Sequence, residues 1–156
     1  MIELRKITFD NLEECIKLEP KDEQKSFVAS NMHSLAEAYI AITNNEGIPI
    51  PYAIYDNNVM VGFIMLVYEE AADNSGENVY WVCRLMIDKR YQGKGYGKET
   101  IAKALEFMRT FPKGKATAVS LSYEPENIVA KTLYASLGFV ETGEIQDGEL
   151  IAKLAL

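Results

Sequence analysis

Histidine and cysteine are scarce in this chain of 156 residues, which has one histidine, His33, and two cysteines, Cys15 and Cys83. Two cysteines in a chain of this length do not make a disulfide framework, and no His/Cys cluster has the spacing of a metal site. A single histidine also disfavours a catalytic triad that uses this residue. We therefore expect a reduced, cytoplasmic protein that holds no metal ion.

Long hydrophobic runs are missing as well. No apolar stretch approaches the ~20 residues that span a membrane, and the segment Met1–Ile7 lacks the apolar core of a signal peptide. Basic residues are in the minority, with 16 Lys and Arg against 23 Asp and Glu and a formal net charge of −7. The missing apolar stretch gives no reason to expect a membrane as partner. The acidic charge argues against a nucleic acid and favours cationic small molecules.

What the chain does have is the composition of a folded globular protein. Hydrophobic residues make up 48% and charged residues 25% of the sequence, which is an ordinary mixture for such proteins. The length allows one domain with a sizeable core. A single domain over residues 1–156 is therefore expected.

Hydrophobic periodicity predicts the order strand, helices, three strands, helix, strand, helix and two strands. The strands are expected at 2–7, 52–55, 59–68, 80–87, 116–122, 139–145 and 150–156. The helices are expected near 10–20, within 22–42, at 100–111 and from 127 onward. Residues 47–51 are expected to break the pattern, and residues 69–78 to form a loop.

The most informative segment is a glycine-rich loop between a predicted strand and a predicted helix. Residues 88–99 read Asp-Lys-Arg-Tyr-Gln-Gly-Lys-Gly-Tyr-Gly-Lys-Glu. Such a loop offers unpaired backbone N–H groups and the positive end of a helix dipole, and its glycines allow a bulky ligand to approach closely. The basic residues of the loop are Lys89, Arg90, Lys94 and Lys98. An anionic ligand, most simply a phosphate, is indicated.

Two common phosphate-binding motifs do not fit this loop. A P-loop ends in Gly-Lys-Ser/Thr, whereas Gly97 and Lys98 are followed by Glu99. A dinucleotide fingerprint needs a glycine three residues after Gly95, where this chain has lysine. The spacing present is Gln-x-x-Gly-x-Gly, which begins at Gln92.

A second motif follows about thirty residues later. Residues 127–139 read Asn-Ile-Val-Ala-Lys-Thr-Leu-Tyr-Ala-Ser-Leu-Gly-Phe. Asn127 is suited to cap a short helix, and Gly138 to end it in the left-handed conformation. Leu133 and Leu137 have the spacing of core residues. From these residues alone, the segment is predicted to be a short capped helix with the two leucines in the core.

The two motifs, in this order and at this separation, resemble the GNAT superfamily of N-acetyltransferases, strongly over residues 81–139 and in outline elsewhere. The resemblance implies an α/β fold: a mixed sheet of about seven strands with helices on both faces, splayed between the fourth and fifth strands, where acetyl-CoA enters. The cofactor-binding residues that it implies are Leu85, Met86, Ile87, Gln92, Gly93, Lys94, Gly95, Tyr96, Gly97, Lys98, Asn127 and Tyr134.

The resemblance also implies transfer of an acetyl group from acetyl-CoA to an amine. The amine must be neutral to attack and the departing thiolate needs a proton, so a base and an acid are required. Tyr134 matches the general acid of the family. No spacing selects the base, although Glu69, Glu70 and Glu77 border the expected acceptor side. Cys83 offers a ping-pong alternative, but a buried core cysteine is the favoured interpretation.

Three further segments, 27–31, 81–84 and 138–144, resemble the bacterial spermine/spermidine acetyltransferase branch, although Cys83 stands where some members of that branch carry an aspartate. A cationic amine such as a polyamine is the expected acceptor, steered by acidic walls. The candidate carboxylates are Asp22, Glu23, Glu37, Glu69, Glu70, Glu141 and Glu144. The alternatives are acetylation of an amino acid, an aminoglycoside or a protein N-terminus, or a non-catalytic acetyl-CoA-binding module. The oligomeric state is left open, a homodimer included.

Overall fold

The computed structural model describes residues 1–72 and 76–156. Its elements follow the predicted order. They are β1 (Ile2–Lys6), α1 (Leu12–Lys17), the 3₁₀ turn η1 (Asp22–Gln24), α2 (Asn31–Asn44), β2 (Ile48–Asp56), β3 (Val59–Glu69), β4 (Val79–Ile87), α3 (Tyr96–Met108), β5 (Ala118–Tyr123), α4 (Ile128–Ser136), β6 (Val140–Gln146) and β7 (Glu149–Ala155). The middle of the predicted loop at 69–78 lies outside the described residues.

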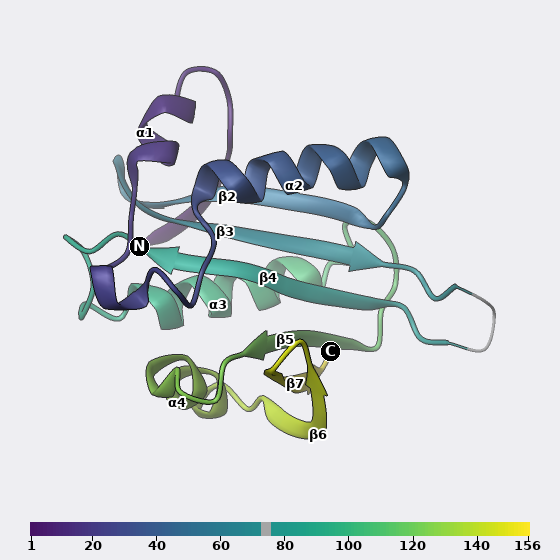
Figure 1. Cartoon of the computed structure of the whole chain (residues 1–156). Helices are drawn as coiled ribbons and strands as arrows, with labels where there is room; N and C mark the ends of the chain where they lie inside the picture. The colour runs from purple at the N-terminus through teal and green to yellow at the C-terminus, as the bar shows by residue number, and fades with distance from the viewer. Residues whose placement is uncertain (73–75) are drawn as a thin grey trace.

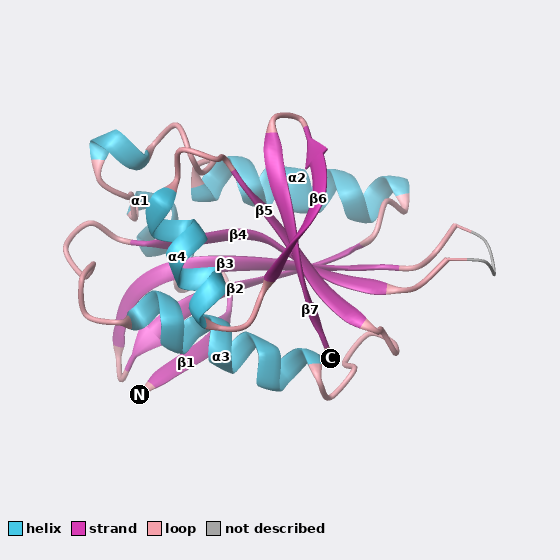
Figure 2. Ribbon diagram, turned by 90° about the horizontal axis from the view of Figure 1, so that it is seen from below, coloured by secondary structure: helices cyan, strands magenta, loops and turns pink. Residues whose placement is uncertain are grey.

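The seven strands form one mixed sheet in the order β1-β2-β3-β4-β5-β7-β6 (Figure 1). Neighbouring strands run antiparallel, except that β4 and β5 are parallel. α1 and α2 cover one face of the sheet, and α3 and α4 lie on the other (Figures 1 and 2). The prediction of a mixed sheet with helices on both faces is confirmed.

Each face of the sheet has its own hydrophobic core, because successive side chains of a strand point to opposite faces. On β3, Ile64 belongs to the core under α3 and α4, whereas Phe63 belongs to the core under α1 and α2. Ile101 and Met108 of α3 are fully buried in the first core, and Cys15 of α1 is fully buried in the second. No helix within the described ranges is long and apolar enough to cross a membrane.

The second strand is longer than predicted, since β2 begins at Ile48 and includes Pro49 and Pro51. The two prolines were expected to break the pattern. β1 pairs with β2 only from Tyr52 to Asp56, so at both prolines no strand of the described part of the chain pairs with the side of β2 away from β3. A proline is tolerated at such a free edge, where its missing N–H removes no ladder bond.

The predicted start of the third α-helix is wrong by four residues. α3 begins at Tyr96 rather than at residue 100. Its N-cap is Gly95, which has no side chain that could bond to the first N–H groups of the helix. The helix ends at Met108, and Phe111, three residues later, has left-handed backbone geometry with φ 54°. Gly97 and Lys98 therefore lie in the first turn of the helix, directly where its unpaired N–H groups are.

The fourth and fifth strands separate along their length, as predicted. β4 and β5 pair only from Val79 with Ala118 to Val82 with Leu121. Beyond this point a β-bulge interrupts the β3–β4 ladder, and Cys83 is the extra residue. A bulge bends its strand, and Figure 2 shows the two strands diverging toward their C-terminal ends. Among the described residues, no strand pairs with the edge of β4 that faces β5 in this part.

Candidate functional site

The glycine-rich loop connects the diverging end of β4 to the N-terminus of α3. Gly93 and Gly95 have φ values of 79° and 83°, a left-handed region that side chains with a Cβ adopt at a cost. A Cβ placed on either glycine would meet no atom within 4 Å. The loop therefore uses glycine for its conformation and faces open space, in which its N–H groups are accessible to a ligand.

A cleft of about 360 Å³ opens between this loop, β4, β5, α4 and the segment between α1 and α2. All the residues predicted to bind the cofactor line this cleft except Lys94. The ammonium group of Lys94 instead lies 5.7 Å from the centre of the Tyr91 ring. The fold thus brings together two motifs that are about thirty residues apart in sequence.

Several lining residues were not identified from the sequence. Gln24 approaches the cleft from the end of η1, and Phe27 and Val28 approach it from the segment between η1 and α2. Ser122 and Tyr123 approach it from the end of β5. Phe27 and Val28 lie in a segment that carried the resemblance to polyamine acetyltransferases, but Gln24, Ser122 and Tyr123 gave no signal. Their positions beside the cleft depend on how the elements pack in the fold, and a short sequence motif contains no information about that packing.

The side chain of Gln92 fixes the start of the loop. Its amide nitrogen donates to the backbone carbonyl of Ile87 at 3.0 Å and to the side-chain carbonyl of Gln24 at 2.7 Å. The first bond ties the loop to the end of β4, and the second ties it to the opposite wall of the cleft. Tyr96 is also held, because its hydroxyl donates to Asp56 at 2.7 Å.

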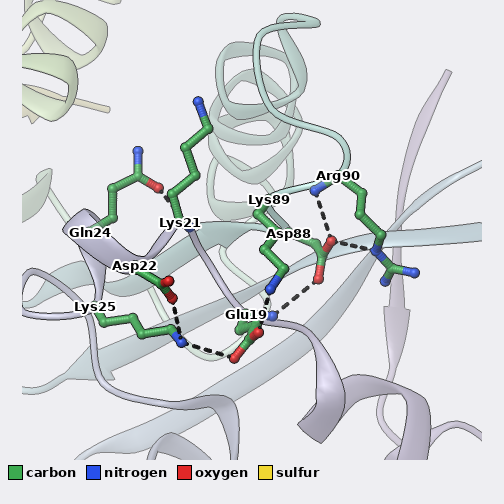
Figure 3. Close-up of polar contacts among 8 residues, drawn as sticks. All are labelled: Glu19, Lys21, Asp22, Gln24, Lys25, Asp88, Lys89 and Arg90. Atoms are coloured by element: carbon green, nitrogen blue, oxygen red, sulfur yellow. Dashed lines mark hydrogen bonds and ion pairs between the residues drawn. The ribbon is translucent and has the colours of Figure 1, made fainter.

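A polar network joins the loop to the segment between α1 and α2 (Figure 3). At its centre the buried carboxylate of Asp88 accepts from the Arg90 side chain at 2.7 Å, from the Arg90 backbone N–H at 3.0 Å and from the Glu19 N–H at 3.1 Å. Around it, the carboxylate of Glu19 pairs with Lys89 at 2.6 Å and with Lys25 at 3.2 Å. Burial raises the pKa of Asp88, but these donors together outweigh it and hold the pKa below its usual value.

Replacing Asp88 by asparagine should destabilise the protein by about 2 kcal/mol, because a charge-assisted hydrogen bond contributes about 1.5–3 kcal/mol. The melting temperature should then fall by about 4–8 °C, measured by thermal unfolding. Asp22→Asn is the matched control. It removes an ion pair with Lys25 from a side chain that is 86% exposed, so it should change the melting temperature little. Equal melting temperatures for the two variants would contradict the central role of Asp88.

Tyr134 of α4 is held in place by two other aromatic residues. Its ring centre lies 5.9 Å from that of Tyr123, which it stacks upon, and 5.8 Å from that of Phe139, which it meets edge to face. The residue is 8% exposed and lines the cleft. Burial, with a smaller contribution from Tyr123, raises the pKa of Tyr134 to about 12. The hydroxyl therefore keeps its proton at neutral pH and can donate it.

The ends of α4 have the predicted geometry. The side chain of Asn127 caps the helix and accepts from the Ala130 N–H at 3.2 Å. Gly138, which follows the C-cap Leu137, has φ 94°, as expected for a left-handed stop. Asn127 also lines the cleft, so capping and ligand contact are compatible at this position.

The carboxylates considered as the base do not reach this cleft. Glu69 and Glu70 line a separate hollow together with Glu46, and Glu77 accepts from the Thr117 hydroxyl at 2.8 Å. None of these is among the residues of the described ranges that line the cleft with Tyr134. These three carboxylates therefore lie away from the cleft that contains Tyr134, because the pairing of β3 with β4 places them at the opposite end of the strands.

A thiol mechanism is also disfavoured. Burial raises the pKa of Cys83 to about 11, so the thiol stays protonated at neutral pH and is a weak nucleophile. Its side chain packs against the core under α1 and α2. Within residues 1–72 and 76–156, no three His, Cys, Asp or Glu side chains are placed to hold a metal ion.

Three of the carboxylates expected to form acidic walls are occupied by cations. Asp22 pairs with Lys25 at 2.8 Å, Glu37 with Arg84 at 2.8 Å and Glu141 with Lys131 at 3.2 Å. The expected walls are thus partly neutralised.

Comparisons with known proteins agree with this arrangement. The model of the acetyltransferase (GNAT) family matches residues 10–139. The spermine/spermidine N(1)-acetyltransferase of Bacillus subtilis (strain 168) is 31% identical over 153 residues, which cover 96% of this chain and 95% of that protein. In fold, the chain is similar to the spermidine N-acetyltransferase of Vibrio cholerae, solved with CoA and spermine, with a TM-score of 0.72, 20% identity and coverage of 99% and 95%. It is also similar to the aminoglycoside acetyltransferase AAC(6')-Ib solved with coenzyme A, with a TM-score of 0.76, 18% identity and coverage of 99% and 95%.

Proposed function

Because the chain belongs to the acetyltransferase (GNAT) family, we propose that it transfers the acetyl group of acetyl-CoA to a primary amine of a polyamine such as spermidine or spermine. The observation that carries this proposal is the shared cleft. A glycine-rich anion loop, an unpaired strand edge and a protonated tyrosine all border one space.

The residues around the cleft fit acetyl-CoA. The N–H groups of the loop 93–97 and of the first turn of α3 are suited to the pyrophosphate, with Lys98 adding positive charge. The free edge of β4 at residues 85–87 is suited to the amides of the pantetheine arm. When bound, acetyl-CoA supplies an acetyl group activated as a thioester. The open space beside Gly93 and Gly95 supports this placement.

Tyr134 is the proposed general acid. A tyrosine in the cleft that keeps its proton at neutral pH can donate it to the sulfur as the thiolate forms. The stacking of Tyr123 on the ring and the edge-to-face contact of Phe139 limit the positions that the hydroxyl can take. This rigidity supports a role in which the position of the proton matters.

The polyamine acceptor is supported by the sequence relationship and by charge. The curated relative that is 31% identical acts on spermine and spermidine according to its name. The net charge of −7 attracts long cations. Some carboxylates are neutralised by ion pairs, so the attraction depends on the charge of the whole molecule as much as on a few side chains.

A panel of amines, read out by release of free CoA thiol, tests this proposal. Spermidine and spermine should react faster than amino acids, aminoglycosides and a peptide N-terminus. The second-order rate constant for the polyamines should fall as salt rises, because the Debye length shortens from ~10 Å at 0.1 M to ~3 Å at 1 M. If polyamines are inert and another amine reacts, the acceptor assignment is wrong. If CoA binds and no amine reacts, the protein is a binding module.

A further inference from the structure

Three carboxylates accept a hydrogen bond from a side chain that lines the cleft. The pairs are Tyr96 with Asp56 at 2.7 Å, Tyr123 with Glu141 at 2.9 Å and Ser122 with Glu149 at 2.5 Å. A carboxylate behind a cleft-lining hydroxyl can receive a proton that a ligand passes to that hydroxyl. These three pairs are therefore candidates for the base that the reaction needs.

The three carboxylates differ in their ion pairs. Asp56 pairs with the amino group of Met1 at 2.9 Å, and Glu141 pairs with Lys131 at 3.2 Å. No ion pair within the described part of the chain involves Glu149. A cation partner favours the charged form of a carboxylate and so opposes its protonation. Glu149 alone among the three has no such partner.

Ser122 is also at the right place in the sheet. The last residue of β5 that pairs with β4 is Leu121, so Ser122 is the first residue of β5 at the opening between the strands. Glu149 is the first residue of β7, and the antiparallel pairing of Tyr123 with Leu150 brings it beside the end of β5. The pair therefore stands where the gap begins and is linked by a short contact typical of a hydroxyl that donates to a carboxylate.

We propose that Glu149 is the proton acceptor for the substrate amine and acts through the hydroxyl of Ser122. This inference rests on the proposed function, because it needs an ammonium group in the cleft. One N–H bond of the ammonium breaks and its proton moves to the Ser122 oxygen, while the original hydroxyl proton moves to the Glu149 carboxylate. The nitrogen keeps the electron pair and becomes the nucleophile. Glu149 is half-buried and returns the proton to solvent.

The test compares Glu149→Gln and Ser122→Ala with the unaltered protein. Glutamine keeps an oxygen that can accept from Ser122 but takes up no proton. In Glu149→Gln, the single-turnover rate with spermidine should fall about 100-fold, at the lower end of the range for a positioned base. In Ser122→Ala the same rate should fall less, because a water molecule can take the place of the hydroxyl. Spermidine affinity, measured by calorimetry on the CoA-bound protein, should stay nearly the same in both variants.

Glu106→Gln is the matched control for net charge. Glu106 lies on the exposed side of α3 and pairs with Lys103 at 3.2 Å, so its loss should leave rate and affinity unchanged. A full single-turnover rate in Glu149→Gln would overturn the proposal. A loss of spermidine affinity with an unchanged rate would overturn it too, because Glu149 would then only hold the cation.

The same experiment separates this inference from the acceptor assignment. If the unaltered protein acetylates a different amine, the polyamine assignment fails and the variants are measured with that amine, for which the same loss of rate is expected. If no amine in the panel reacts, both proposals are wrong. A melting temperature measured for each variant confirms that the folded protein is compared.

Discussion

Tyr134→Phe is expected to lower kcat by about 10²–10⁴-fold, the usual contribution of a positioned acid, and to leave CoA affinity nearly unchanged. Phenylalanine keeps the ring that stacks on Tyr123 and meets Phe139, and only the hydroxyl is lost. Burial raises the pKa of this hydroxyl to about 12, so the native protein carries the hydroxyl proton at neutral pH. The variant has no such proton to donate. Steady-state kinetics and calorimetry with CoA measure the two quantities.

Tyr80→Phe is the control for this substitution. Tyr80 is fully buried, and its hydroxyl donates to the Gly114 carbonyl at 2.9 Å. Its loss should cost about 1 kcal/mol of stability without changing kcat, because Tyr80 does not line the cleft. If Tyr134→Phe behaves like Tyr80→Phe, with full turnover and a small loss of stability, Tyr134 is a packing residue.

Gly95→Val is expected to weaken CoA binding by about 100-fold or more, which corresponds to about 2.7 kcal/mol. The added side chain would project from the loop into the open cleft, where the pyrophosphate is proposed to lie. Ligand stabilisation of about 2.7 kcal/mol at 100 times the native dissociation constant should then be nearly lost. Calorimetry gives the affinity, and thermal unfolding with and without CoA gives the stabilisation.

Gly143→Val separates the effect on the ligand from backbone strain. Gly143 lies on β6 with φ 85°, close to the 83° of Gly95, and a Cβ at either position would meet no atom within 4 Å. Both variants should therefore lose similar stability, about 1–2 kcal/mol or more for a side chain in the left-handed region. Only Gly95→Val should lose affinity. Equal CoA affinities in the two variants would show that the loop does not contact the phosphates.

The sequence allowed the loop and α4 to be predicted because their signals are local. Glycine at positions 93 and 95 reports the backbone conformation directly, since other residues adopt it at a cost. Asn127 and Gly138 likewise mark the two ends of α4 by chemistry that acts within a few residues. The order of strands and helices followed from periodicity, and the family resemblance added the gap between the fourth and fifth strands.

The base could not be predicted because it depends on strand pairing. Glu69, Glu70 and Glu77 are near β4 in sequence, yet the hairpin carries them away from the cleft. Ser122 and Glu149 are 27 residues apart and meet only because β7 pairs with β5 in a particular register. The extended β2 has the same cause: Pro49 and Pro51 fit a strand only where its outer edge is free, which depends on the length of β1.

The short ladder between β4 and β5 also divides the sheet into two stretches of continuous chain. β1 to β4 come from residues 2–87 and β5 to β7 from residues 118–155, and every other strand pairing lies within one stretch. Joining the stretches closes a long loop, at an entropic cost that backbone bonds offset over four residue pairs only. The cleft thus opens at the seam between the two stretches, where folding gains only these few backbone bonds. The same unpaired edge that contributes nothing to the folding of the sheet is available to a ligand.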